Sequence, residues 1–233
     1  MAGLPIRLRG AAGKSGTSRP PRAVLCDGAG MDTTGAGAAA LEMLEAALLH
    51  MRAVADRTTP DDFGRPTPCE DYDVRCLLEH VIGWQQVFSA CAADRQPALV
   101  DGSPTYAAWS DPATDLRAAS AILIENLRHR SDPAIILPYR GKTGVDLLVD
   151  ELLAETVIHT WDLATAIGTT VDFDDRIVSA AHVGLSELLA ESFADIGFRP
   201  PEQPAVARSE FQRLLLRSGR RLRWQGSATS RTC

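Results

Sequence analysis

The stretch ELLAETVIHTWDLATAIG, residues 151 to 168, combines a helical pattern with polar groups on its apolar side. At about 100° per residue, Glu155 and His159 lie about 40° apart, and Asp162 lies about 20° on the other side of Glu155. The same face carries an apolar stripe at helical spacing, made of Leu148, Leu152, Leu163 and Ala166. The helix therefore directs two carboxylates and an imidazole toward its own core, where polar groups without partners cost several kcal/mol.

A second segment, VRCLLEHVIGWQQVFSACAA, supplies another inward histidine, His80. The residues on its side of that helix are Cys76, Leu77, Trp84, Val87 and Cys91. Antiparallel packing in a bundle can bring the two faces together. A shared divalent cation would then satisfy His80, Glu155 and His159 at once. Two imidazoles and a carboxylate suit Zn²⁺ and also form the set used for Fe²⁺, and three protein ligands leave positions open for water or substrate.

The alternative to a metal is a buried hydrogen-bond or ion-pair network of the same three residues. Asp162 has three roles open to it: a fourth ligand, a partner that orients the ring of His80 or His159, or a bond to backbone; the orienting role is favoured over direct ligation. Cys76, one turn before His80, could reach the same point, but an inert packed cysteine is favoured. Cys69 is predicted to be a buried turn residue. The histidines without matching partners are His50, His129 and His182.

The elements that would position these residues are mainly helical. Helices are predicted over residues 38–57, 74–93, 113–128, 146–168, 174–197 and 209–219, with a short β-like run and a turn in residues 133–145. Because strand-like runs are too short to build a sheet, the prediction is an all-α fold. Its simplest form is a bundle of four principal helices with additional C-terminal helices.

Charge divides the chain into three parts. Residues 1–30 hold five basic residues and one acid, and residues 208–233 hold seven arginines and one acid, so the net charge of -6 leaves about -16 on residues 31–207. We expect a disordered basic extension over residues 1–34, the bundle over 35–220 and a disordered tail over 221–233. Met31 is a candidate start of the native chain. For the arginines between Arg208 and Arg223, a solvated face is favoured over binding of an anionic substrate.

Composition excludes several classes of function. So acidic a central region is a poor match for nucleic acid, whose binding depends on phosphate neutralisation. No apolar run approaches the roughly 18 residues that a membrane span needs. The five cysteines, Cys26, Cys69, Cys76, Cys91 and Cys233, form no CxxC pair and do not resemble a disulfide framework. We therefore expect a cytoplasmic protein that binds neither membrane nor nucleic acid, and the sequence leaves a homodimer open.

Two segments together resemble the DinB-like, mycothiol-dependent maleylpyruvate isomerase family of metal-binding bundles, which is common in actinobacteria. The first has the form T-P-C-x-x-[WY]-D-V-R-x-L-x-x-H, matched by Thr67, Pro68, Cys69, Tyr72, Asp73, Val74, Arg75, Leu77 and His80. The second has the form E-x-x-x-H-x-W-D-L-A, matched by Glu155, His159, Trp161, Asp162, Leu163 and Ala164. The resemblance covers roughly residues 38–220. It implies that His80, Glu155 and His159 bind a divalent metal, most simply zinc.

The resemblance also implies a thiol as co-substrate. In the isomerase, the metal stabilises the thiolate of mycothiol, which adds to the substrate, and a separate C-terminal domain contributes an arginine. Only about 60 residues follow the helix of the second segment, and they are predicted to form two helices and a tail, so maleylpyruvate isomerisation itself is not expected. The favoured function is activation of a mycothiol-like thiol for transfer or addition to a small electrophile, as an S-transferase or isomerase. The alternative is a non-catalytic metal- or ligand-binding bundle.

Overall fold

The computed structural model describes residues 33–70, 72–107, 111–190, 207–224 and 226. Within them the chain is mainly helical, which confirms the predicted all-α, DinB-like fold. The helices are α1 (Thr33–Ala55), α2 (Val74–Ala92), α3 (Pro112–His129), α4 (Val145–Ala166), α5 (Asp175–Ala190) and α6 (Glu210–Arg217), with a short 3₁₀ turn, η1, at Pro60–Asp62.

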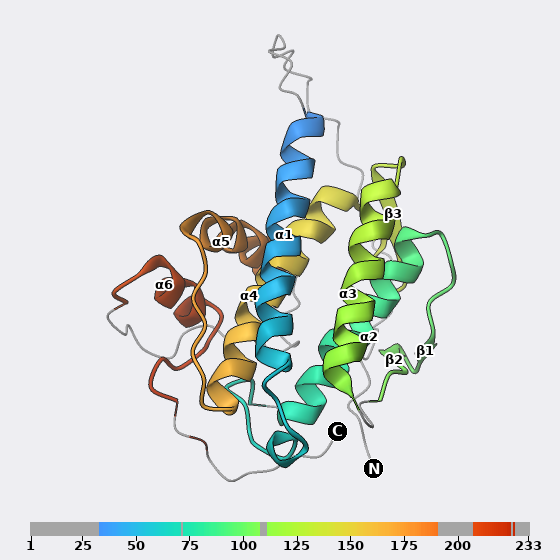
Figure 1. Ribbon diagram of the computed structural model, residues 1–233. Helices are drawn as coiled ribbons and strands as arrows, with labels where there is room; N and C mark the ends of the chain where they lie inside the picture. The colour runs from blue at the N-terminus through green and yellow to red at the C-terminus, as the bar shows by residue number, and fades with distance from the viewer. Residues whose placement is uncertain (1–32, 71, 108–110, 191–206, 225, 227–233) are drawn as a thin grey trace, which may run out of the picture.

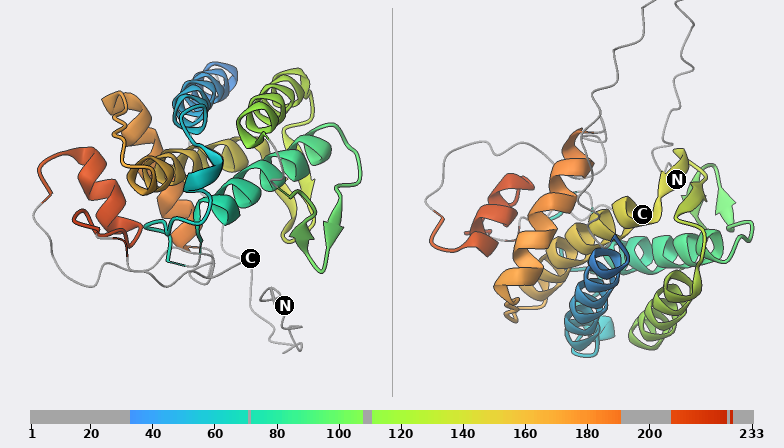
Figure 2. Two further views of the ribbon diagram at one scale, coloured as in Figure 1. Left: turned by 60° about the horizontal axis from the view of Figure 1, so that its bottom comes forward. Right: turned by 90° about the horizontal axis from the view of Figure 1, so that it is seen from above.

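Four helices form the bundle that holds the candidate ligands. Helix α1 packs against α3 and α4, and α2 packs against the same two helices. Helix α5 lies along α4, and α6 packs on α5. Figures 1 and 2 show α5 and α6 together on one side of the bundle, with the strands on the opposite side. The C-terminal helices are thus an addition to the bundle, as predicted.

Two small hairpins interrupt the helical chain. Strands β3 (Ala134–Leu137) and β4 (Gly141–Gly144) pair antiparallel and confirm the β-like run predicted before α4. Strands β1 (Leu99–Val100) and β2 (Ser103–Pro104) form a second hairpin that was not predicted. Its two-residue turn is Asp101-Gly102, and both residues have positive φ, 50° and 80°. Because Asp-Gly favours this left-handed turn, the dipeptide was the signal available in the sequence.

Helix α4 runs between two clusters of buried apolar side chains. Its residues 148–158 contribute to the larger cluster with α1, α2, α3 and α5. Leu163, Ala164 and Ala166 belong to the second, with residues from α1, α2 and α3. Along α4, the polar residues His159 and Asp162 lie between the residues that enter the first cluster and those that enter the second. No helix among the described residues has the length and apolarity to cross a bilayer.

The terminal predictions extend beyond the described residues. Helix α1 begins at Thr33, earlier than the predicted residue 38, and Gly37 lies against the first turn of α4, where an added Cβ would be 2.8 Å from Asp146 Oδ1. Most of the extension over 1–34 and of the tail over 221–233, the candidate start at Met31, and the end of the predicted helix over 174–197 lie outside the described residues.

Close approach of α5 to α4 depends on Gly184. A Cβ at this position would lie 1.8 Å from the carbonyl oxygen of Asp150 in α4. We therefore expect Gly184→Ala to lower the free energy of unfolding by about 1–3 kcal/mol through overpacking. Thermal or denaturant unfolding followed by circular dichroism measures this change.

Gly64→Ala is the matched control, because nothing lies within 4 Å of its added Cβ. Gly184 lies within helix α5, where helix propensity alone favours alanine over glycine by about 1 kcal/mol. A loss of stability in Gly184→Ala therefore reports the contact with α4. Equal or higher stability of Gly184→Ala would contradict the packing described.

Candidate metal centre

The loop before α2 is folded by the first signature segment. The Thr67 hydroxyl donates to the carbonyl oxygens of Cys69 (3.0 Å) and Tyr72 (2.9 Å), and the Thr67 N–H donates to the same Tyr72 carbonyl at 3.1 Å. The Tyr72 N–H in turn donates to the Cys69 carbonyl at 2.9 Å. These bonds satisfy a tight turn that is largely buried, so the positions of Cys69 and Tyr72 are fixed before the helix begins.

Helix α2 then directs His80 at the site. Asp73 is its N-cap and accepts a hydrogen bond from the N–H of Cys76 at 2.8 Å, which satisfies one of the free donors of the first turn. The phenol oxygen of Tyr72 lies 3.2 Å from Nδ1 of His80. With Nδ1 engaged by Tyr72, the other ring nitrogen, Nε2, faces α4.

Helix α4 supplies the two other donors. Glu155 Oε2 lies 3.0 Å from His159 Nε2 and 3.8 Å from His80 Nε2. One ligand atom from each of these three residues lies within 4.8 Å of the others. The structure thus brings together all three metal ligands predicted from the sequence. The side chains of His80 and Glu155 are 23% and 24% exposed, whereas that of His159 is 4% exposed, so one side of the group is open.

The far side of His159 is closed by a buried ion pair. Asp162 is completely buried, and its Oδ2 lies 3.0 Å from His159 Nδ1. Arg220, which follows α6, donates from Nη2 to Asp162 Oδ2 (2.7 Å) and from Nε to Oδ1 (3.1 Å). Of the roles open to Asp162, this geometry fits the orientation of His159. The solvated face preferred for the C-terminal arginines is wrong for Arg220, because it finds a buried carboxylate; Arg208, Arg213, Arg217, Arg221 and Arg223 are exposed.

Charge in the group is balanced by direct contacts. Burial raises the pKa of Glu155, but hydrogen bonds with His159 and His80 outweigh it and hold this pKa well below its ordinary value. Burial likewise raises the pKa of Asp162, and the Arg220 guanidinium and His159 hold it below the ordinary range. Burial lowers the pKa of His80. For His159 burial acts in the same direction, but hydrogen bonds to Asp162 and Glu155 prevail and raise its pKa.

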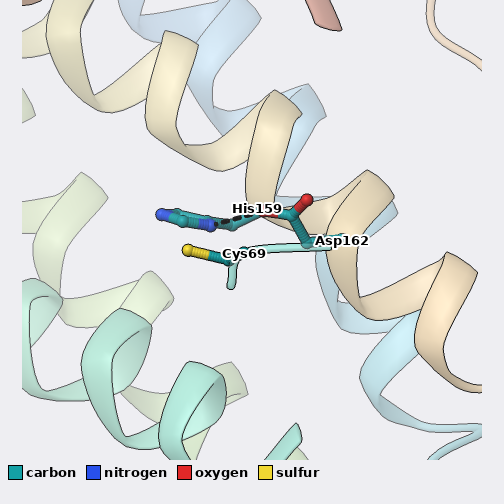
Figure 3. A group of neighbouring side chains, drawn as sticks. All are labelled: Cys69, His159 and Asp162. Atoms are coloured by element: carbon teal, nitrogen blue, oxygen red, sulfur yellow. Dashed lines mark hydrogen bonds and ion pairs between the residues drawn. The ribbon is translucent and has the colours of Figure 1, made fainter. Parts of the chain in front are cut away.

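A second group of potential ligands shares His159. Ligand atoms of Cys69, His159 and Asp162 also lie within 4.8 Å of one another, and all three residues are buried. Figure 3 shows the Cys69 sulfur beside the His159 ring, with Asp162 bonded to that ring from the same helix. Cys69 is a buried turn residue, as predicted, but its proximity to His159 was not predicted. Both Asp162 oxygens already accept hydrogen bonds from Arg220, so a cation on this side would be repelled by the positive charge of the guanidinium.

The other candidate residues lie outside both groups. Cys76 is buried in α2 and disulfide-bonded, so it is neither a ligand nor the free packed cysteine that was expected. His129 Nδ1 contacts the carbonyl of Glu125, and His182 Nε2 contacts that of Glu210. The His50 ring packs against Phe173. Trp84, which is half-buried, stacks on Phe88 and meets Tyr139 edge-on.

Comparison with known proteins matches this part of the chain. Residues 44–164, which carry both signature segments and all three candidate ligands, match the model of the mycothiol maleylpyruvate isomerase N-terminal domain. The chain belongs to this family. Two curated relatives from two strains of Mycobacterium tuberculosis, each described as an uncharacterized protein, are 28% identical over 149 residues, which is 62% of this chain and 73% of each relative. No solved structure matches the chain.

Membership in the mycothiol maleylpyruvate isomerase N-terminal family implies metal binding and a relation to mycothiol. The family match ends at Ala164, whereas the resemblance was expected to extend to about residue 220, so the match includes Asp162 but not Arg220. Sequence reasoning missed this arginine because nothing in the basic segment distinguishes position 220 from its neighbours. Tyr72 was visible only as a motif position, and its contact with His80 needed the fold.

The Tyr72 hydroxyl offers a direct test of the geometry around His80. We expect Tyr72→Phe to weaken zinc binding roughly tenfold, because losing a hydrogen-bond partner of a ligand histidine typically costs 10–100-fold in affinity. Competition with a chromophoric chelator measures this affinity.

Tyr106→Phe is the control, since the Tyr106 hydroxyl donates to Asp115 at 2.7 Å and contacts no candidate ligand. It removes the same atom and should leave zinc affinity unchanged. Equal affinities for Tyr72→Phe and the unmodified protein would show that Tyr72 does not orient His80.

Proposed function

We propose that this protein binds a divalent cation, most simply Zn²⁺, through His80, Glu155 and His159, and uses it to activate a low-molecular-weight thiol. The observation that carries the proposal is the convergence of Nε2 of both histidines on one Glu155 oxygen, while each Nδ1 is engaged elsewhere, by Tyr72 and by Asp162. Metal-binding histidines are normally held in this way through the second ring nitrogen.

The spacing of the donors supports zinc. With Zn–N bonds of about 2.0–2.1 Å and Zn–O bonds of about 2.0–2.2 Å, two ligands of a tetrahedral site lie roughly 3.3 Å apart. The distances from Glu155 Oε2 to the two Nε2 atoms, 3.0 and 3.8 Å, lie on either side of that value. Small side-chain movements would complete the site. Two histidines and a carboxylate are also compatible with Fe²⁺, so metal analysis decides the native ion.

The open side of the group would admit the thiol. His80 and Glu155 are partly exposed, so a co-substrate can approach from solvent between α2 and α4, while His159 stays buried against Asp162. A bound cation lowers the pKa of a coordinated thiol below its free value near 8.5 and makes thiolate available at neutral pH. The protein's own residues supply the rigid frame: Tyr72 orients His80, and Asp162 orients His159.

The reaction we propose is addition or transfer of that thiol to a small electrophile, with a mycothiol-like compound as the thiol. The family relation to mycothiol supports this choice. The Asp162–Arg220 pair lies on the buried side of His159, away from the open side, so it holds the ligand rather than the substrate.

A non-catalytic bundle is the competing function, and the direct Glu155–His159 contact of 3.0 Å is the observation that favours it. In that case the three residues form an ion-pair network, or hold a cation that stabilises the fold. The two functions differ in what the loss of one ligand does: a catalytic site loses reaction with little loss of folding, whereas a structural site loses thermal stability.

We expect purified protein to contain close to one equivalent of divalent metal and His159→Ala to contain less than a tenth, because two ligands cannot hold the ion. Elemental analysis after reconstitution and desalting measures the content. His129→Ala is the control, since it removes an exposed histidine outside the group. Full metal content in His159→Ala would place the cation elsewhere.

Zinc affinity should rise with pH through the neutral range. His159 has a raised pKa, so below that pKa its Nε2 carries a proton that the metal must displace. His80 and Glu155, whose pKa values are lowered, are already deprotonated there. Chelator competition between about pH 6 and about pH 8 measures the dependence, which should level off above the raised pKa. An affinity independent of pH over this range would contradict the assignment of His159.

The catalytic proposal is tested with the metal-loaded protein, a panel of thiols that includes mycothiol, and a panel of small electrophiles. We expect thiol consumption above the uncatalysed rate, lost in His159→Ala although that variant is still folded at the assay temperature, and kept in His129→Ala. A melting temperature that falls sharply in His159→Ala, without any thiol reaction in the unmodified protein, would instead establish the structural role.

A further inference from the structure

Arg220 differs from the other described arginines of the C-terminal segment, because it is buried (4% exposed) and reaches the candidate metal centre. It lies 56 residues beyond the end of the family match at Ala164. Its partner Asp162 is fully buried on α4. A segment outside the four-helix bundle therefore contributes a charge to the interior of the bundle.

Arg220 is held in place by hydrogen bonds of both its backbone and its guanidinium. The backbone N–H of Arg220 donates to the Leu215 carbonyl at 2.9 Å, which ties it to the end of α6. Its Nη1 donates to the Ser218 carbonyl at 3.1 Å, and Nε and Nη2 form the two-point contact with Asp162. A two-point contact fixes the plane of the carboxylate as well as its position.

That fixed carboxylate sets the orientation of the His159 ring. Asp162 Oδ2 lies 2.7 Å from Arg220 Nη2 and 3.0 Å from His159 Nδ1, so the same oxygen serves both. With Nδ1 held there, Nε2 faces Glu155 at 3.0 Å. Arg220 thus holds Asp162, Asp162 holds the His159 ring, and the ring presents Nε2 to the proposed cation.

The same contacts bear on the second group, Cys69, His159 and Asp162. Thiolate, imidazole and carboxylate are zinc ligands in their own right, and the three ligand atoms lie within 4.8 Å of one another. Both oxygens of Asp162 accept hydrogen bonds from Arg220. The positive charge of Arg220 would therefore repel a cation bound beside Asp162 and Cys69. A guanidinium keeps its charge at any pH at which the protein is folded.

We propose that Arg220 is a positioning residue that selects between the two groups: it holds Asp162 so that His159 binds the cation through Nε2, and it excludes a cation from the Cys69 side. This inference rests on the proposed metal site at His80, Glu155 and His159. Removing the charge of Arg220 frees Asp162, and Cys69 then becomes a ligand, with its thiol proton released to solvent.

The test is titration of the full-length, metal-free protein with Co²⁺, followed by visible and near-ultraviolet absorption. We expect the unmodified protein to bind one equivalent without sulfur-to-cobalt charge-transfer absorption. Arg220→Met should bind at least tenfold more weakly at the original site, in line with the roughly 10–100-fold cost of losing support around a ligand. It should also acquire the charge-transfer band, and Arg220→Met/Cys69→Ser should lose it.

Two further variants keep the test independent of folding defects. Arg220→Lys retains the charge but not the two-point contact, so it should bind more weakly without the sulfur band. Asp162→Asn removes the carboxylate and should weaken binding roughly 10–100-fold, also without the band. Arg213→Met is the matched control, because Arg213 is exposed and pairs with Glu210 of its own helix; it should behave as the unmodified protein.

The outcomes separate this inference from the proposed function. If Arg220→Met binds Co²⁺ with the same affinity and spectrum as the unmodified protein, the role of Arg220 alone is overturned. A sulfur band in the unmodified protein or in Arg220→Lys has the same consequence. Asp162→Asn with undiminished affinity has the same effect. If the unmodified protein binds no Co²⁺ at all while Arg220→Met binds it through sulfur, the result supports exclusion by Arg220 and overturns the proposed site. No binding in any variant overturns both.

Discussion

The Asp162 carboxylate is the constraint on which the site depends. It is completely buried, and such a group is tolerated only where opposite charge and hydrogen bonds replace its water. Arg220 and His159 provide both, from two segments that are far apart in the chain. The carboxylate thereby joins the segment after α6 to α4 and fixes the ring of the central candidate ligand. A buried ion pair contributes little net stability, because desolvation offsets its attraction. Its main effect here is to fix the positions of Asp162 and His159.

Helix α4 meets two requirements at once. Its apolar residues enter two separate hydrophobic clusters, and His159 and Asp162 fall where one contribution ends and the other begins. The opposing helix α2 is positioned by a loop whose own hydrogen bonds hold Tyr72 against His80. Each histidine is thus supported by a residue of its own signature segment. These motifs therefore encode the orientation of the candidate ligands as well as their identity.

Prediction from sequence succeeded where local periodicity and motif spacing carry the information. The helices, the turn before α4 and the convergence of His80, Glu155 and His159 follow from those patterns, because a helical face is set by its own residues. The β1–β2 hairpin rested on the single dipeptide Asp101-Gly102 and was missed. The disulfide state of Cys76 was also missed, since cysteine spacing alone does not show which thiols meet in space.

Local sequence patterns were enough to predict an all-α chain with three candidate metal ligands on the inner faces of two helices, and the family match covers residues 44–164 of that chain. The residues that lie behind those side chains became known only from the folded chain. Arg220 is one of several arginines in a basic segment, and its burial depends on how α6 packs on α5 and α5 on α4. Cys69 likewise reaches His159 through the path of a loop. Contacts between distant segments are set by packing, which has no period in the sequence and becomes visible only in the folded chain.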